Sequence, residues 1–133
     1  MWEPSSDVVF QSAQVEVVNA TGMSFVLRVD LADTTARRAR GLMFRRTLAD
    51  DEGMLLLFSS PTMNAFWMRN TLVPLSIAFI DEDEMIIDMQ NMEPLTSTLH
   101  VPDGAYRWAL EASQGWFGTR ALESGDSVHL TGS

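Results

Sequence analysis

Residues 66–75 organise the chain, and they read Phe66-Trp67-Met68-Arg69-Asn70-Thr71-Leu72-Val73-Pro74-Leu75. Side chains of an extended segment alternate between two faces, so Trp67 and Arg69 are expected to share a face. Residues 70–71 are typical of a turn, because both side chains readily hydrogen-bond to nearby backbone. Pro74 cannot donate to a sheet and favours an extended residue before it.

Two interpretations of this segment stay open. The indole of Trp67 needs a hydrogen-bond acceptor, and the guanidinium of Arg69 needs an anion or a stacking surface. The segment can therefore be a core strand that runs into a turn, with Arg69 held by a structural carboxylate. The alternative is a binding pocket at the end of a strand.

Composition narrows the class of protein. The 133 residues predict a single domain, residues 1–133, with residues 1–7 as a loose polar lead-in. The net charge of −9 argues against a nucleic-acid partner, because such binding depends on neutralising phosphates. The absence of cysteine excludes disulfides, thiolate nucleophiles and cysteine-ligated zinc. No apolar run approaches the roughly 18–20 residues of a transmembrane helix.

The spacing of apolar residues predicts the secondary structure. Alternation predicts a hairpin of residues 14–18 and 23–30, and a helix is expected over residues 34–40, with Asp33 as its N-cap and Gly41 after its end. Other strands are expected at residues 8–10, 54–58, 76–80, 85–89, 105–111 and 127–130, with an irregular connection at 91–104 and a second short helix within 114–122. This pattern predicts a β-rich α+β fold built on a rolled or barrel-like, mainly antiparallel sheet with two short helices.

A series of short motifs carries a family resemblance. The motifs are Arg40-Gly41-Leu42-Met43-Phe44-Arg45, Gly53-Met54-Leu55, Phe66-Trp67-Met68-Arg69-Asn70-Thr71, Pro74-Leu75, Phe79-Ile80-Asp81, Leu110-Glu111, Gly115-Trp116-Phe117 and Gly125-Asp126. In order and spacing the series resembles the uncharacterised proteins called domain of unknown function 192, over about residues 13–130. The resemblance implies one β-rich domain, and export from bacteria for many members. It implies no established ligand or enzymatic activity.

Three positions depart from the family pattern. Arg69 stands where lysine is common. Ser76 stands where aspartate is common after Pro-Leu, which weakens any mechanism that needs a carboxylate there. Some members carry cysteines around the segment equivalent to residues 94–101, and this chain has none, so a disulfide on that loop is excluded.

Metal and cofactor chemistry find little support. His100 and His129 lie far apart and belong to no paired-ligand motif, so no metal site is predicted. No glycine-rich phosphate cradle follows a strand, and no cofactor is predicted. Glu111 is the candidate for acid–base chemistry, or else the partner of Arg69 or Arg40 in a structural ion pair.

The favoured function is a small bacterial binding domain, exported or associated with the envelope and without catalysis. Its partner would be a small molecule, glycan or peptide, and its oligomeric state is left open. The predicted ligand-binding residues are Arg40, Trp67, Arg69, Asn70, Thr71, Trp108 and Glu111. One alternative is a hydrolase or lyase that uses Glu111 as its catalytic general acid or base. Another is a protein interaction module without a pocket.

The expected location is periplasmic or envelope-associated, with a signal peptide that is absent from this sequence. A cytoplasmic location is the alternative. The first residues, Met1-Trp2-Glu3-Pro4, show neither the basic region nor the apolar stretch of a signal peptide.

Overall fold

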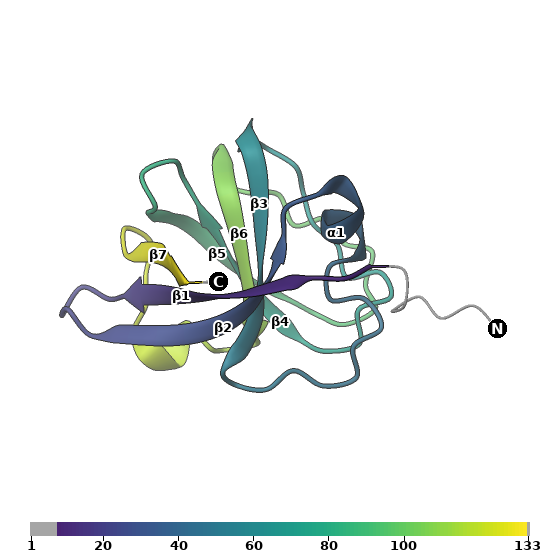
Figure 1. Cartoon of the computed structure of the whole chain (residues 1–133), viewed down its shortest axis with the longest axis horizontal. Coiled ribbons are helices and arrows are strands. Elements are labelled where there is room, and N and C mark those ends of the chain that lie inside the picture. The colour runs from purple at the N-terminus through teal and green to yellow at the C-terminus, as the bar shows by residue number, and fades with distance from the viewer. Residues whose placement is uncertain (1–7, 133) are drawn as a thin grey trace.

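A computed structural model describes residues 8–132, and the predicted lead-in of residues 1–7 lies outside this part. Seven strands and two short helical segments make up the described chain (Figure 1). The strands are β1 (Gln11–Val18), β2 (Ser24–Ala32), β3 (Glu52–Thr62), β4 (Leu75–Ile80), β5 (Ile86–Met92), β6 (Tyr106–Ser113) and β7 (Ser127–Gly132). The helical segments are the α-helix α1 (Thr35–Arg40) and the 3-10 turn η2 (Gly118–Arg120).

All seven strands belong to one curled sheet. Its order is β5-β4-β6-β3-β2-β1-β7, and of its described neighbours only β2 and β3 run parallel. In Figure 1, β1 and β2 run across the view while β3 and β6 stand nearly upright, which shows how strongly the sheet curls. The rolled, mainly antiparallel, β-rich fold predicted from the sequence is confirmed.

The two edge strands meet at one end of the roll without closing it. A single antiparallel bridge joins Met85, just before β5, to Ser127 of β7. Beside it, the Ile86 amide donates to the Asp126 carbonyl at 2.8 Å and the Val128 amide donates to the Glu84 carbonyl at 2.9 Å. Beyond these contacts the ladders do not continue, so the sheet is barrel-like but open.

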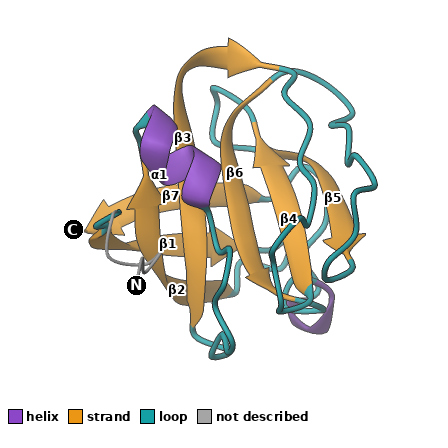
Figure 2. Cartoon of the chain, turned by 90° about the vertical axis from the view of Figure 1, so that its right-hand side faces the viewer, coloured by secondary structure: helices purple, strands orange, loops and turns teal. Residues whose placement is uncertain are grey.

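Alternation along the strands creates two separate cores. Inside the roll, Val15, Leu27 and Leu110 belong to one buried cluster. On the opposite face of β3, β4 and β6, a second cluster contains Leu56 and Phe79. The strand β4 is buried at all six positions because it contributes to both cores. The second core would be open to solvent on its outer side, and Figure 2 shows α1 lying in front of β3 and β6 there.

Several local predictions need correction. Thr34 is the N-cap of α1, because its side chain accepts a hydrogen bond from the Arg37 amide, whereas Asp33 forms an ion pair with the Arg37 side chain at 2.7 Å. Gly41 follows the helix as predicted. The second expected helix is reduced to the 3-10 turn η2.

Candidate functional site

The segment that organises the sequence is a loop over the second core, not a strand. The Phe66 amide donates to the His100 carbonyl at 3.1 Å, and the His100 amide donates back at 2.7 Å. The Met68 amide donates to the Thr96 carbonyl at 3.1 Å. Residues 63–74 and 93–105 are therefore tied together, and we call these two loops the cover. Met68 is buried beneath it, while Trp67 and Arg69 are exposed.

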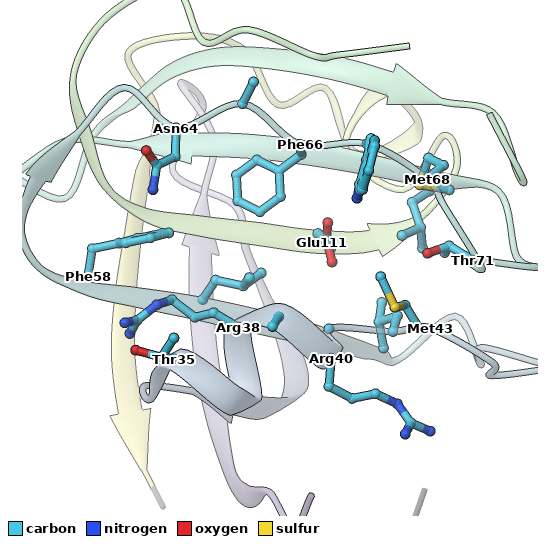
Figure 3. A pocket seen from close by; sticks show the side chains of 17 residues that line it. Thr35, Arg38, Arg40, Met43, Phe58, Asn64, Phe66, Met68, Thr71 and Glu111 are labelled. Carbon is cyan, nitrogen blue, oxygen red and sulfur yellow. The ribbon is translucent and has the colours of Figure 1, made fainter. Parts of the chain in front are cut away.

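A cavity of about 430 Å³ lies between α1, the β3–β6 part of the sheet and the cover (Figure 3). Its larger side chains are mostly apolar. They are Leu42, Met43, Leu56, Phe58, Phe66, Trp67, Met68 and Leu75. The polar and charged lining residues are Thr35, Arg38, Arg40, Asn64, Thr71 and Glu111.

Glu111 occupies the middle of the cavity wall (Figure 3). Its cross-strand neighbours are Met54 on β3 and Ile77 on β4, both buried and apolar. The residue is only 6% exposed. Among residues 8–132 no hydrogen bond or ion pair to its carboxyl group is found, and the completely buried side-chain atom without a partner is His100 Nε2, so the Glu111 oxygen atoms still reach the cavity space. Burial raises the pKa of Glu111 from its ordinary value of 4.5 to about 7, because an apolar surrounding disfavours the charged form.

The arginines near the cavity are committed elsewhere. Arg38 donates to the Leu57 carbonyl at 2.8 Å, and its guanidinium lies 4.9 Å from the centre of the Phe58 ring. Arg40 lies 5.1 Å from the centre of the Phe44 ring and points away from Glu111 in Figure 3. The predicted ion pair between Glu111 and an arginine does not form.

Three of the predicted residues other than Glu111 line the cavity: Arg40, Trp67 and Thr71. Trp67 is 43% exposed at the mouth, so its ring can meet both solvent and a ligand. Thr71 is buried, and its hydroxyl donates to the Arg69 carbonyl at 3.3 Å, which fixes the turn.

The other three predicted residues lie outside the cavity lining. The Arg69 guanidinium lies 5.5 Å from the centre of the Trp67 ring, so it stacks there instead of meeting a carboxylate. Asn70 shapes the predicted turn, with a left-handed φ of 57° and a carbonyl that accepts from the Phe44 amide at 2.8 Å. Trp108 packs against the core inside the roll, on the other face of β6 from Glu111.

Sequence reasoning missed most of the apolar lining. Leu42 and Met43 belong to the motif that follows the helix, and Phe58 ends the strand predicted over residues 54–58. An apolar residue in a cavity wall has the same sequence pattern as one in a filled core, so no signal distinguished them. Asn64 was not singled out, and its carbonyl accepts from the Tyr106 hydroxyl at 2.6 Å.

The cavity offers a mostly apolar surface with one group, Glu111, that can exchange a proton near neutral pH. Its apolar wall suits the body of a small organic ligand, and the carboxyl of Glu111 can accept a hydrogen bond there. No group of three acidic or histidine side chains that could hold a metal ion occurs among residues 8–132. In the same part of the chain, every helix is too short or too polar to cross a bilayer.

Comparison with known proteins assigns the family. The model of domain of unknown function 192 (DUF192), described as an uncharacterized ACR, matches residues 7–130. The chain belongs to the DUF192 family. A comparison with curated proteins finds no match.

Two solved structures are similar to this DUF192 chain over nearly its whole length. One is a Sinorhizobium meliloti protein described as a candidate transcription regulator, with 30% identity and a TM-score of 0.90, and the match covers 93% of this chain and 97% of that one. The other is a Novosphingobium aromaticivorans protein of unknown function, with 33% identity and a TM-score of 0.86. That match covers 97% of this chain and 98% of the other.

Proposed function

We propose that this domain binds a small organic molecule in the cavity beneath the cover and does not transform it. The ligand has an apolar body and a hydrogen-bond donor that reaches Glu111. The observation that carries the proposal is a buried carboxyl group without a protein partner in the wall of an apolar cavity of about 430 Å³. Pockets that are mostly apolar with a few placed polar groups are typical of small-molecule sites.

Folding alone does not explain Glu111. Its neighbours across the ladder are Met54 and Ile77, and an apolar side chain would pack against both without losing contact with water. Burial raises the free energy of the charged carboxylate, as the raised pKa of Glu111 indicates. A ligand that donates to this carboxyl would remove that cost in the complex.

The lining narrows the proposed ligand class. Glycans expose many hydroxyl groups and need many polar partners, whereas this cavity offers mainly hydrocarbon and ring surface. A small molecule, or one apolar side chain of a peptide, matches it better. The cavity also weighs against an interaction module that lacks a pocket.

The proposal is tested by screening small molecules against the protein labelled at its methionine methyl groups. Met43 and Met68 line the cavity, while Met23 and Met85 are exposed elsewhere and serve as internal references. We expect a ligand to shift the Met43 and Met68 signals and to leave the reference signals in place.

A matched pair of variants locates the site. Ala39 and Ala36 are both exposed on α1, but only Ala39 lines the cavity. Ala39→Trp should weaken the binding of every hit, and Ala36→Trp should not. Hits that bind Ala39→Trp as well as the wild type, or that shift mainly Met23 or Met85, would contradict this site.

A second candidate is a hydrolase or lyase with Glu111 as general acid or base. The observation that favours it is the Glu111 pKa of about 7, since proton transfer is most effective when the pKa lies near the working pH. Thr71 and Asn64, both in the loop of residues 63–74, are uncharged polar lining residues that could assist Glu111 in proton transfer. Incubating each hit with wild type and with Glu111→Gln, then analysing products by mass spectrometry, separates the two functions. Product formed by wild type alone would establish catalysis.

A DNA-binding role receives less support. The Sinorhizobium relative is described as a candidate transcription regulator, but this chain carries a net charge of −9. Affinity for DNA rests largely on neutralising phosphates with basic side chains. We therefore favour a small-molecule ligand over a nucleic acid.

We propose an envelope location for this domain, supported by the family resemblance. Cell fractionation of the native organism with an antibody against the chain tests it. Signal confined to the cytoplasmic fraction would contradict export.

A further inference from the structure

The charges around the cavity are distributed unevenly. Glu111 is the one acidic residue in the described lining, and its carboxyl points into the cavity (Figure 3). Arg38 is held by the Leu57 carbonyl and the Phe58 ring, and Arg40 lies beside the Phe44 ring. Both guanidinium groups keep their positive charge, but each is directed at another group and neither pairs with Glu111.

Aromatic rings surround the same space. Phe58, Phe66 and Trp67 all line the cavity. The face of an aromatic ring is electrically negative and attracts cations, most strongly where water is excluded. Arg38 already lies over the Phe58 ring and Arg69 over the Trp67 ring. Phe66 is therefore the lining ring that has no arginine over it among the described residues. Together with the carboxylate, that ring is suited to an organic cation.

We infer that the ligand of this cavity is a small organic amine, bound as a cation with its ammonium group on Glu111 and its hydrocarbon body against the aromatic and methionine side chains. This inference rests on the proposed binding function and adds the charge of the ligand to it.

The charged and titratable groups around Glu111 come from several elements. On β3 and β4 its neighbours Met54 and Ile77 carry no charge. On β6, Tyr106 is fully buried, and its pKa is raised by burial and by the nearby Glu111, so it stays neutral. On α1 the charged side chains are Arg38 and Arg40, whose positive charges oppose a bound cation, so the pairing with Glu111 has to outweigh them. The cover contributes Arg69, which stacks on the outer side over Trp67.

Binding of an amine should consequently depend on pH. Because the pKa of Glu111 is about 7 in the free protein, its carboxyl is largely protonated well below neutrality and ionised above it. An amine that pairs with the carboxylate binds best once the proton has left. The affinity should rise with pH through neutrality, as long as the amine itself remains protonated.

Three probes of the same shape test the inference. They are 2-phenylethylamine, 2-phenylethanol and phenylacetate, which are cationic, neutral and anionic at neutral pH. Titrations followed by calorimetry and by the Met43 and Met68 methyl signals compare wild type with Glu111→Gln at about pH 8 and about pH 5.5. Each titration gives a dissociation constant for one charge state of one molecular shape.

The expected order for wild type at about pH 8 is amine, then alcohol, then carboxylate, with roughly tenfold or more between amine and alcohol. Glu111→Gln should bring the amine to the affinity of the alcohol. Lowering the pH to about 5.5 should weaken amine binding to wild type by about tenfold or more and leave the alcohol nearly unchanged.

Two results would overturn the inference. If the alcohol or the carboxylate binds at least as tightly as the amine, the cation preference is wrong while the binding site itself stands. If none of the three shifts the Met43 or Met68 signals at millimolar concentration, the amine assignment fails as well, and the wider screen with Ala39→Trp decides the proposed function separately. Alcohol binding by Glu111→Gln shows that this variant is folded and that its cavity is intact.

Discussion

At the scale of single residues, the burial of Glu111 lowers the stability of the folded protein at neutral pH. In the unfolded chain its carboxyl has an ordinary pKa of 4.5, and in the folded protein the pKa is about 7. Between these values the unfolded state loses its proton first, so stability falls as pH rises from the lower pKa to the higher one. Above both values the loss is at most about 3 kcal/mol, because each pKa unit corresponds to about 1.4 kcal/mol.

Replacing Glu111 by glutamine removes that penalty. Glu111→Gln should be close to wild type in stability at about pH 4.5 and more stable by about 1–3 kcal/mol at about pH 8. Urea denaturation of both proteins across this range measures the difference, and other titrating groups cancel in the comparison. A difference that stays constant with pH would contradict the raised pKa of Glu111.

Asn70 is expected to serve the turn and not the ligand. Its φ of 57° lies in the left-handed region, which glycine adopts freely and alanine does not. Asn70→Gly should retain stability, and Asn70→Ala should lose about 1 kcal/mol relative to it. Thermal denaturation measures this, and both variants should bind the screening hits like wild type. Loss of binding in a folded Asn70→Gly protein would restore the ligand contact predicted from the sequence.

The sequence indicated some residues of the cavity lining but not the partners of the charged groups. Glu111, Trp67, Arg40 and Thr71 do line one cavity. The partners of charged groups could not be predicted, because they come from elements distant along the chain. The guanidinium of Arg69 meets an adjacent ring, and the carboxyl of Glu111 meets apolar side chains.

At the scale of elements, the alternation of apolar and polar residues located strands, but the sequence did not show which strands pair. The hairpin of β1 and β2 follows directly from the spacing of apolar residues on both sides of the turn at residues 19–22. The parallel pairing of β2 with β3 has no local signal in the sequence. It is set by how the buried faces of the two strands come together in the folded protein. The sequence also did not show the partners of residues 66–75. Their backbone hydrogen bonds go to residues 96–100 of a second loop and not to a neighbouring strand.

The pairing of β3 with β6 depends on Gly53. A Cβ at this position would overlap the Glu111 carbonyl and would come within 2.9 Å of the Leu27 Cδ2 atom. Gly53→Ala should therefore push the two strands apart and destabilise the protein by about 2 kcal/mol. Gly118→Ala is the control, because a Cβ there would meet nothing within 4 Å. Equal urea midpoints for the two variants would show that the strands do not approach so closely.

At the scale of the whole molecule, the sheet is most firmly held at its centre. β6 pairs along its length with both β3 and β4, whereas the edges at β5 and β7 are joined by one bridge and the few hydrogen bonds beside it. Native-state hydrogen exchange should be slowest for the β6 and β3 amides and fastest in the hairpin tip at residues 81–84 and in residues 94–104. Equally slow exchange in the hairpin tip would indicate a closed barrel.

The presence of two cores has an evolutionary consequence. One set of side chains fills the roll, while another, supplied by α1, the residues just after it, residues 64–71 and the facing strands, lines the cavity. On the proposed binding function, substitutions at the exposed lining positions, such as Ala39 and Trp67, would change the ligand with little effect on the scaffold. The same proposal implies that proteins of this architecture can differ in ligand, so a ligand identified for one homologue should be retested on the next before it is assigned.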